Sequence, residues 1–283
     1  MDKDFLIEVF NDTERWIDEE PVLTEAVLKS IEGTKVYLSA EYPAQNTGEH
    51  GLDTTVSVSP YSSFEASMAL RRKFRDSKIA VHNFASATDP GGGVREGSRA
   101  QEESLCRCST LYPVLNTEAL QQSYYGYHRQ FRDMRYTDRC IYSPGILIIK
   151  TDTDMPERMD MKEWCQVDVI TCAAPNLSGK VYGSGRRAGF EPIAVDDDEL
   201  KRLHKRRAEH MLNVAAANKA EILVLGAFGC GAFCNDPQSV AEAYKEVLPH
   251  FYGSFRHIEF AVRCSPMKKS KNYSVFKNAL GQI

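Results

Sequence analysis

The sequence predicts a layered α/β domain in which helices cover both faces of a mixed sheet. Short apolar, β-branched segments alternate along the chain with longer segments of helical periodicity, and this alternation is typical of α/β folds. Of the 283 residues, 42% are hydrophobic and 26% are charged, which is the balance of an ordinary globular protein. A chain of this length buries roughly three quarters of its unfolded surface, so it can form a substantial core.

The first half of the chain predicts three strands and four helices. Apolar residues at helical spacing indicate a helix that ends at Gly33, and the segment IAVHNF is apolar enough for a central strand. That strand runs into Asp89-Pro90-Gly91-Gly92-Gly93, where helix and strand must both stop. Ser98 is an acceptable N-cap for the helix that follows. The expected strands cover 35–39, 54–59 and 79–84, with a polar loop at 45–53. The expected helices cover 12–32, 62–74, 98–112 and 116–133.

The second half continues the alternation. The segments ILII, VDVITCA, EILVL and the residues from Ile258 to Val262 read as strands. A long amphipathic segment and a segment that begins at Pro237 read as helices. The expected strands cover 146–149, 167–173, 221–225 and 258–262. The expected helices cover 197–218 and 237–252.

Charge and cysteine content exclude several classes of function. The formal net charge is −4 and the sequence pI is about 6.0, which argues against general binding of nucleic acid or anionic membranes. No segment has the length and apolarity of a signal peptide or a membrane span. The eight cysteines are irregularly spaced, so we expect reduced thiols and a cytoplasmic protein. No closely spaced set of ligands predicts a metal site.

Two glycine-rich loops follow apolar strands, which is where ligands bind in α/β sheets. One of them, LGAFGCGAFCNDP, precedes the helix that begins at Pro237. Its glycines allow backbone amides to form a nest for a diphosphate. It is neither a P-loop nor a Rossmann fingerprint. A tight strand-to-helix connection without a ligand would explain the same residues.

The other loop, DPGGGVREGSRAQEE, carries more chemistry. Glu102 and Glu103 form a pair of carboxylates, and such pairs serve glycosidic cleavage: one donates a proton while the other stabilises an oxocarbenium-like transition state. Repulsion between the two would raise one pKa, whereas the N-terminus of a helix would lower it, and the sequence leaves open which effect wins. Acidic residues are also common in the first turn of helices that have no catalytic role.

These motifs together resemble the microbial type of the poly(ADP-ribose) glycohydrolases. The resemblance rests on the three glycines followed by Gln101-Glu102-Glu103, on YSPG at 142–145, on VDVITCAAPN at 167–176 and on the loop GAFGCGAFCNDP. It covers roughly residues 8–265. It implies a macrodomain-like three-layer α/β/α sandwich with a mixed sheet, in which residues 1–75 form an N-terminal helical extension on a catalytic core over 76–283.

The resemblance also implies roles for particular residues. Glu103 would be the general acid, and Glu102, helped by Gln101, would hold the ribose hydroxyls. Asn83 would donate a hydrogen bond on the ribose side. The remaining expected contacts come from the two glycine loops: Gly91, Gly92 and Gly93 around the reacting ribose and the diphosphate, Gly229, Cys230, Gly231 and Ala232 on the diphosphate through backbone amides, and Phe233 on the adenosine side.

The implied function is hydrolysis of ribose–ribose O-glycosidic bonds with release of ADP-ribose and without a metal or cofactor. The partners would be ADP-ribose or poly(ADP-ribose) on modified macromolecules, and we expect a monomer. Two alternatives stay open: removal of single ADP-ribosyl groups from protein or nucleic acid, and a reader of ADP-ribose that lacks catalysis. A thiol nucleophile at Cys230 is rejected, because inside a glycine loop its backbone N–H is of more use than its thiol.

Overall fold

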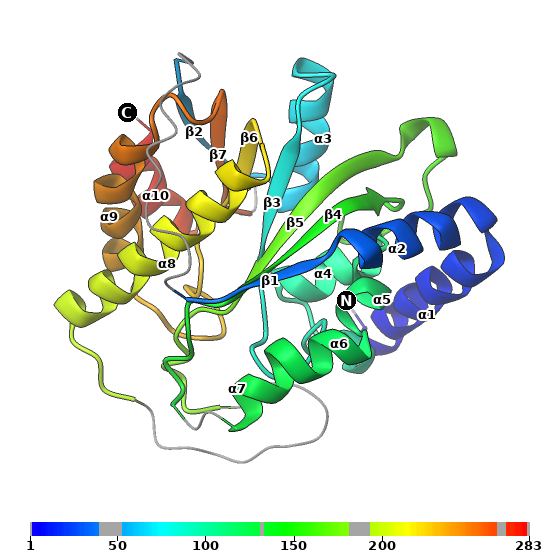
Figure 1. The fold of residues 1–283 in the computed structure, drawn as a ribbon, viewed down its shortest axis with the longest axis horizontal. Helices are drawn as coiled ribbons and strands as arrows, with labels where there is room; N and C mark the ends of the chain where they lie inside the picture. Colours follow the sequence, from blue (N-terminus) through cyan, green and yellow to red (C-terminus); the bar gives the residue numbers. More distant parts are fainter. Residues whose placement is uncertain (1, 40–52, 131–132, 181–192, 265–269, 282–283) are drawn as a thin grey trace.

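A seven-stranded mixed sheet forms the centre of the protein (Figure 1). The computed structural model describes residues 2–39, 53–130, 133–180, 193–264 and 270–281. The strand order is β1-β4-β5-β3-β6-β7-β2, and β5, β3, β6, β7 and β2 are parallel while β4 is antiparallel to both of its neighbours. The strands are β1 (Lys35–Tyr37), β2 (Thr55–Ser59), β3 (Ile79–Phe84), β4 (Cys140–Ile148), β5 (Cys165–Cys172), β6 (Ile222–Leu225) and β7 (His257–Ala261).

Helices cover both faces of the sheet, as the sequence predicts (Figure 1). Alternate strand residues point to opposite sides, so that in β3 Ile79 and Val81 join one core cluster while Ala80 joins the other. The first cluster packs against α1 (Lys3–Glu19), α2 (Pro21–Gly33), α3 (Ser63–Lys73), α4 (Gln101–Cys108) and α5 (Leu111–Leu115). The second packs against α8 (Asp197–Ala217), α9 (Pro237–Val247) and α10 (Lys271–Leu280). The architecture is a three-layer α/β/α sandwich.

The helix expected over 12–32 is wrong in extent, because the structure has two helices there. α1 begins at Lys3, where the Asp2 side chain caps it by accepting from the N–H of Asp4. It ends at Glu20, whose backbone is extended (φ −102°, ψ 108°). The residue before a proline is disfavoured in the helical region, and Pro21 then begins α2 at a position where its missing N–H costs nothing.

The two edge strands of the sheet, β1 and β2, both come from the first 75 residues. β1 pairs with β4 and β2 pairs with β7. The N-terminal part of the chain therefore supplies strands as well as helices to this sheet. The division into an extension and a core at residue 75 stays a prediction. The polar loop expected over 45–53 falls mostly outside the described residues.

β4 and α10 differ most from the sequence-based expectation. β4 begins at Cys140, six residues before the expected start, and a β-bulge between Ser143 and Ile146 accommodates Pro144 and Gly145. These two residues made the segment resemble a loop. α10 was not predicted at all; Ser270 caps it, and Phe276 and its last residue pack into the second core cluster.

The expected helical segment 116–133 is divided into α6 (Glu118–Leu120), a π-helical turn (Gln121–Gly126) and α7 (Tyr127–Gln130). Tyr124 and Tyr125, in the π-helical turn, are fully buried and belong to the first core cluster. Within the described ranges, no helix combines the length and apolarity needed to cross a membrane.

Candidate active site

Both glycine loops line one cavity at the carboxyl ends of the parallel strands. The cavity has a volume of about 670 Å³, within the range of small-molecule sites. Eight of the residues predicted for the site line it: Gly92, Gln101, Glu102, Glu103, Gly229, Gly231, Ala232 and Phe233. Loops that are 133 residues apart in the sequence, counted from Gly93 to Gly226, thus meet at one place, because β3 and β6 are neighbours in the sheet.

The catalytic segment enters α4 later than the sequence predicts. Ser98 is not the N-cap; Ala100 is, and the helix begins at Gln101. The residues before it form a closed turn, in which the N–H of Ser98 donates to the carbonyl of Gly93 and Gly97 adopts a left-handed conformation. This turn places Glu102 and Glu103 in the first turn of α4, directly under Gly92.

Glu102 is held firmly by donors from β3 and the loop after it. Its side chain is 2% exposed. One oxygen accepts from the N–H of Ser86 at 2.6 Å, and the other accepts from the Asn83 side-chain amide at 3.3 Å. Asn83 also donates to the Thr171 hydroxyl. Asn83 is not among the residues that line the cavity, so the residue predicted to bond to the ribose contacts Glu102 instead.

Glu103 has one hydrogen-bonded oxygen and one buried oxygen without a hydrogen-bond partner among the described residues. Its side chain is 6% exposed. Oε1 accepts from the backbone N–H of Gly93 at 2.9 Å, whereas Oε2 has no hydrogen-bond partner among the described residues. Gly93 therefore holds the Glu103 carboxylate through its backbone N–H and does not itself line the cavity. The two glutamates differ: Glu102 has donors on both oxygens, whereas Glu103 has one buried oxygen without a hydrogen-bond partner among the described residues.

The pKa values of both carboxyls are raised, and burial is the largest cause in each case. For Glu102 the charge of Glu103 is the second cause, and the hydrogen bonds from Ser86, Asn83 and Gly91 act in the opposite direction. Desolvation thus outweighs the effect of the helix N-terminus that the sequence left open. The pKa of Glu102 is raised well above its ordinary value and that of Glu103 is raised as well, so the pair holds a proton more readily than two exposed glutamates do.

Gln101 uses its side-chain amide within the protein. Its oxygen accepts from the N–H of Phe84 at 2.8 Å, and its nitrogen donates to the carbonyl of His82 and to the hydroxyl of Ser63. These bonds tie the start of α4 to the end of β3 and to α3. Its predicted contact with ribose stays a prediction, while its role in positioning the neighbouring glutamate is visible in the structure.

Gly92 is required at its position. Its φ is +56°, and a Cβ there would lie 2.6 Å from Glu103 Oε1 and 3.1 Å from Glu102 Oε2. A side chain would therefore collide with the carboxylates of Glu102 and Glu103, in a backbone conformation that L-residues rarely adopt. The neighbouring Gly91 is also left-handed and packs against the ring of Tyr112.

The second loop presents backbone to the cavity. A Cβ at Gly231 would meet nothing within 4 Å, so this glycine borders open space. The turn bonds within the loop use the N–H groups of Phe228, Cys230, Cys234 and Asn235, and none of these four bonds uses that of Gly231. The N–H of Cys230 donates to the carbonyl of Ala227 at 3.1 Å, and Cys230 is not among the lining residues. Its predicted contact with diphosphate stays a prediction.

Aromatic residues that the sequence reasoning missed form part of the wall. Phe84 and Phe228 line the cavity together with Phe233, and the rings of the first two lie 5.8 Å apart. His82 packs edge-on against Phe228 at 4.4 Å, and its burial lowers its pKa to about 3. Their positions in the sequence placed them beside the two glycine loops: Phe84 ends β3, and Phe228 lies between two loop glycines.

Other features do not add chemistry to the cavity. Burial raises the pKa of the Cys230 thiol to about 12, which agrees with rejecting it as a nucleophile. In the part of the chain that is described, no group of three or more His, Cys, Asp or Glu side chains could hold a metal ion.

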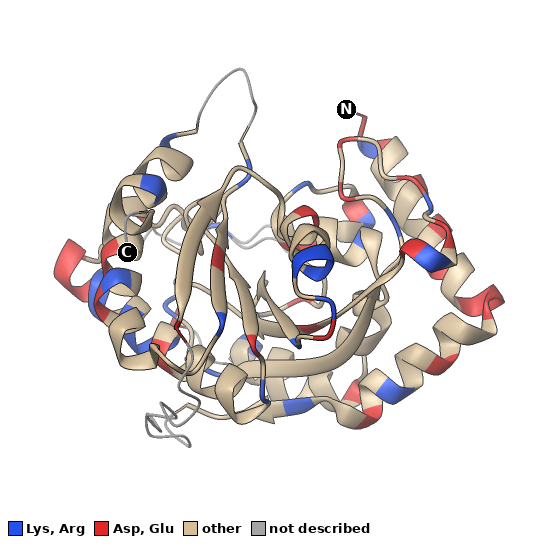
Figure 2. Cartoon of the chain, turned by 90° about the horizontal axis from the view of Figure 1, so that it is seen from above, with Lys and Arg blue, Asp and Glu red and all other residues tan. Residues whose placement is uncertain are grey.

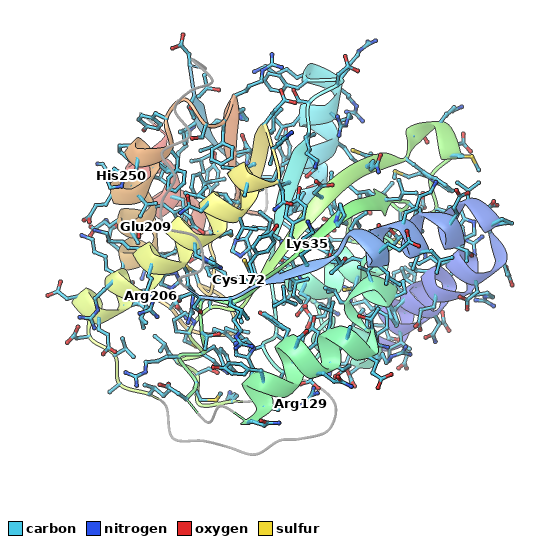
Figure 3. All side chains as sticks on the ribbon, viewed as in Figure 1. Lys35, Arg129, Cys172, Arg206, Glu209 and His250 are labelled. Atoms are coloured by element: carbon cyan, nitrogen blue, oxygen red, sulfur yellow. The ribbon has the colours of Figure 1, made fainter. Side chains whose placement is uncertain are left out.

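α8 carries a basic run of five cations: Lys201, Arg202, Lys205, Arg206 and Arg207. Most of these side chains are paired, and Figure 2 shows acidic and basic residues mixed along the outer helices. Lys201 and Lys205 contact Glu246 of α9. Arg206, labelled in Figure 3, contacts Asp138. The fifth cation of the run, Arg207, is only 1% exposed, so it does not belong to a solvated face.

Comparisons with known proteins agree with this geometry. The family model of the microbial-type PARG catalytic domain matches residues 13–151. No curated protein matches the chain. Among solved structures, poly(ADP-ribose) glycohydrolase from Thermomonospora curvata bound to the inhibitor ADP-HPD is 28% identical, with a TM-score of 0.77 and coverage of 96% of this chain and 98% of that one.

The poly(ADP-ribose) glycohydrolase from Deinococcus radiodurans, solved in complex with ADP-ribose, is 32% identical. The match covers 89% of this chain and 96% of that chain, with a TM-score of 0.72. Identity at this level over nearly the whole length, together with the arrangement of the glutamates and the two glycine loops, places this protein among the microbial-type poly(ADP-ribose) glycohydrolases.

Proposed function

We propose that this protein hydrolyses the ribose–ribose O-glycosidic bonds of poly(ADP-ribose) and releases ADP-ribose. The observation that carries the proposal is the pair of buried glutamates in the lining of a cavity that is also lined by residues of the loop after β6. A reader of ADP-ribose needs the loop but has no use for two carboxylates with raised pKa values. The 32% identical protein was solved with ADP-ribose, which fits a cavity of this size.

Glu103 acts as the general acid. Because burial raises its pKa, it carries a proton, and because Oε1 is occupied by Gly93, the proton sits on Oε2. As the bond between the anomeric carbon and the leaving oxygen breaks, the electron pair goes to that oxygen, which takes the proton. The resulting Glu103 carboxylate then accepts a proton from the water that adds to the anomeric carbon, so the acid is regenerated.

Glu102 stabilises the positive charge on the sugar. Burial and the charge of Glu103 raise the pKa of Glu102, and the hydrogen bonds from Ser86 and Asn83 act against that rise. In the proposed mechanism these donors hold Glu102 in its ionised form, and an anion beside an oxocarbenium-like transition state lowers the barrier. The loop at Gly231 brings backbone N–H groups to the diphosphate and thereby fixes the sugar relative to the carboxylates. We also propose a cytoplasmic location, which is supported by the eight cysteines being free thiols.

Replacing the acid tests the mechanism. Glu103→Gln keeps the shape of the side chain and the acceptor for Gly93 but cannot deliver the proton. We expect kcat on poly(ADP-ribose) to fall by about 10²- to 10⁴-fold, while calorimetry shows ADP-ribose binding with an affinity close to that of the wild type. Turnover that survives in this variant would exclude Glu103 as the acid. Wild-type release from mono-ADP-ribosylated protein but not from polymer would favour the single-unit alternative.

A further inference from the structure

Exposed cations stand at the end of the cavity next to the glutamates. Lys3, in the first turn of α1, and Arg99, three residues before Glu102, both line the cavity and are both exposed. The segments that carry them are in contact, since the carbonyl oxygen of Lys3 lies 2.6 Å from the place that a Cβ would take at Gly97. α1 and the loop before α4 thus form one rim.

The charged side chains with which the rim lines the cavity, Lys3 and Arg99, are both cations, although the protein carries a net charge of −4. The side chains of Lys3 and Arg99 form no ion pair or hydrogen bond with any residue that the structure describes. The acidic groups of the lining, which are the two glutamates and Asp152, are buried, and Asp152 accepts a hydrogen bond from Ser104. Asp2 and Asp4 flank Lys3 in the chain, but neither lines the cavity.

Another cation of the lining is in a different situation. Arg263 follows β7 and forms an ion pair with Asp154 at 2.9 Å. Its charge is therefore already partnered. Lys3 and Arg99 are the cations of this lining that remain available to an anion from outside the protein.

The position of the rim relative to the scissile bond determines which part of the polymer the rim can bind. An ADP-ribose unit that occupies the cavity uses the Gly226–Phe233 loop, which follows β6, for its own diphosphate. The oxygen that Glu103 protonates belongs to the next unit of the chain, which lies outside the cavity. The residues from Gly97 to Ala100 and Lys3 at the start of α1 line the cavity together with the glutamates, so in the proposed mechanism the leaving unit passes them.

We propose that Lys3 and Arg99 bind the diphosphate of the ADP-ribose unit on the far side of the scissile bond, and that this contact makes the protein prefer polymer to single ADP-ribosyl groups. The inference rests on the proposed function. A polymer presents a second diphosphate to the rim, whereas a single ADP-ribosyl group on a protein does not. Unpaired cations at the edge of a cleft attract such an anion and raise its local concentration.

The test is the double variant Lys3→Gln/Arg99→Gln, assayed on poly(ADP-ribose) at low ionic strength. We expect KM to rise about two- to tenfold, as for two exposed ion pairs, with kcat and the Kd for free ADP-ribose unchanged. The difference from the wild type should shrink at roughly 0.5 M salt, because exposed charges are then screened. An unchanged KM at low salt would overturn the proposal, and so would an equal loss of affinity for free ADP-ribose.

A matched control removes the same charge from the other end of the sheet. Arg72 and Lys162 are exposed; Arg71, next to the former, bonds to the carbonyl of Gln166 near the start of β5, so these residues lie away from the cavity. Arg72→Gln/Lys162→Gln should leave KM as in the wild type. If both double variants raise KM equally, the effect comes from the change in net charge, and the proposed binding of a diphosphate by Lys3 and Arg99 is refuted.

Equilibrium binding separates this proposal from the proposed function. With Glu103→Gln as background, labelled polymer is titrated against the single variant and against the triple variant that also carries Lys3→Gln/Arg99→Gln. Weaker binding by the triple variant supports the rim whether or not the wild type turns over polymer. Equal binding refutes it. An inactive wild type that still binds polymer through the rim would refute only the proposed hydrolysis.

Discussion

Gly231 offers a test of the diphosphate loop that leaves the fold intact. A Cβ at this position meets no atom within 4 Å, and Gly231 is not among the residues with positive φ. Gly231→Ala should therefore fold like the wild type, with a Tm within about 2 °C, since an exposed substitution away from contacts changes stability by about 0.5 kcal/mol or less.

The same methyl group should weaken ligand binding, because it occupies the space through which a phosphate approaches the backbone. The loss of one hydrogen bond between an N–H group and a charged phosphate oxygen costs about 1.5–3 kcal/mol. At roughly 1.4 kcal/mol for each tenfold change, this corresponds to an increase in the Kd for ADP-ribose of about ten- to hundredfold. Isothermal titration calorimetry with ADP-ribose measures the change directly.

A second glycine of the loop supplies the contrast. Gly229 has a φ of +74°, and a Cβ there would lie 2.6 Å from the Cβ of Ala174. Gly229→Ala should lower stability by about 1–3 kcal/mol through backbone strain alone, and its Tm should fall. If Gly231→Ala binds ADP-ribose as tightly as the wild type does, the diphosphate does not lie against this part of the loop and the placement of the substrate is refuted.

The remaining predictions concern the acid and the core. Activity that requires protonated Glu103 is complete below its raised pKa and falls as the pH rises through that pKa; a kcat that stays flat up to pH 9 would contradict this assignment. Asp138→Asn removes the counter-charge of Arg207, which is 1% exposed and lies 3.2 Å from the Asp138 carboxylate. We expect a loss of about 3–5 kcal/mol in the free energy of unfolding, measured with urea. Glu246→Gln, which breaks the ion pairs of Lys201 and Lys205 at the exposed surface, should change stability little, and an equal effect of the two substitutions would refute the distinction between buried and exposed pairs.

Local patterns predicted most of the elements that surround the site. β3 and α8 lie within one residue of their expected bounds, because each has a strong periodicity and clear end signals. The prediction of an element was wrong in extent where a proline or glycine lay within a segment of strand-like or helical pattern. Pro144 and Gly145 concealed the first part of β4, whose bulge accommodates them, and Pro21 divided a helix that apolar spacing alone presented as continuous.

The residues of the site likewise fall into those that local sequence predicted and those that it did not. The glycines and the two glutamates were recognisable from the sequence, since their chemistry and spacing are local. The contacts of Asn83 and Gln101 were not, because a side chain that bonds to a group on a neighbouring element leaves no trace in the spacing of the sequence. Phe84 and Phe228 were missed for the same reason: an aromatic residue next to a glycine loop can face the core or a cavity, and only packing distinguishes the two.

By itself, the sequence determined the alternation of strands and helices, the two glycine-rich loops and the adjacent pair of glutamates, because each of these depends on residues close together in the chain. The tertiary structure alone decided that β3 and β6 lie side by side and bring the loops to one cavity. It also decided that burial raises the pKa of both glutamates, and which oxygen of Glu103 is left without a hydrogen-bond partner among the described residues. Desolvation and hydrogen-bond geometry depend on neighbours that are distant in the chain, and folding is what assembles them.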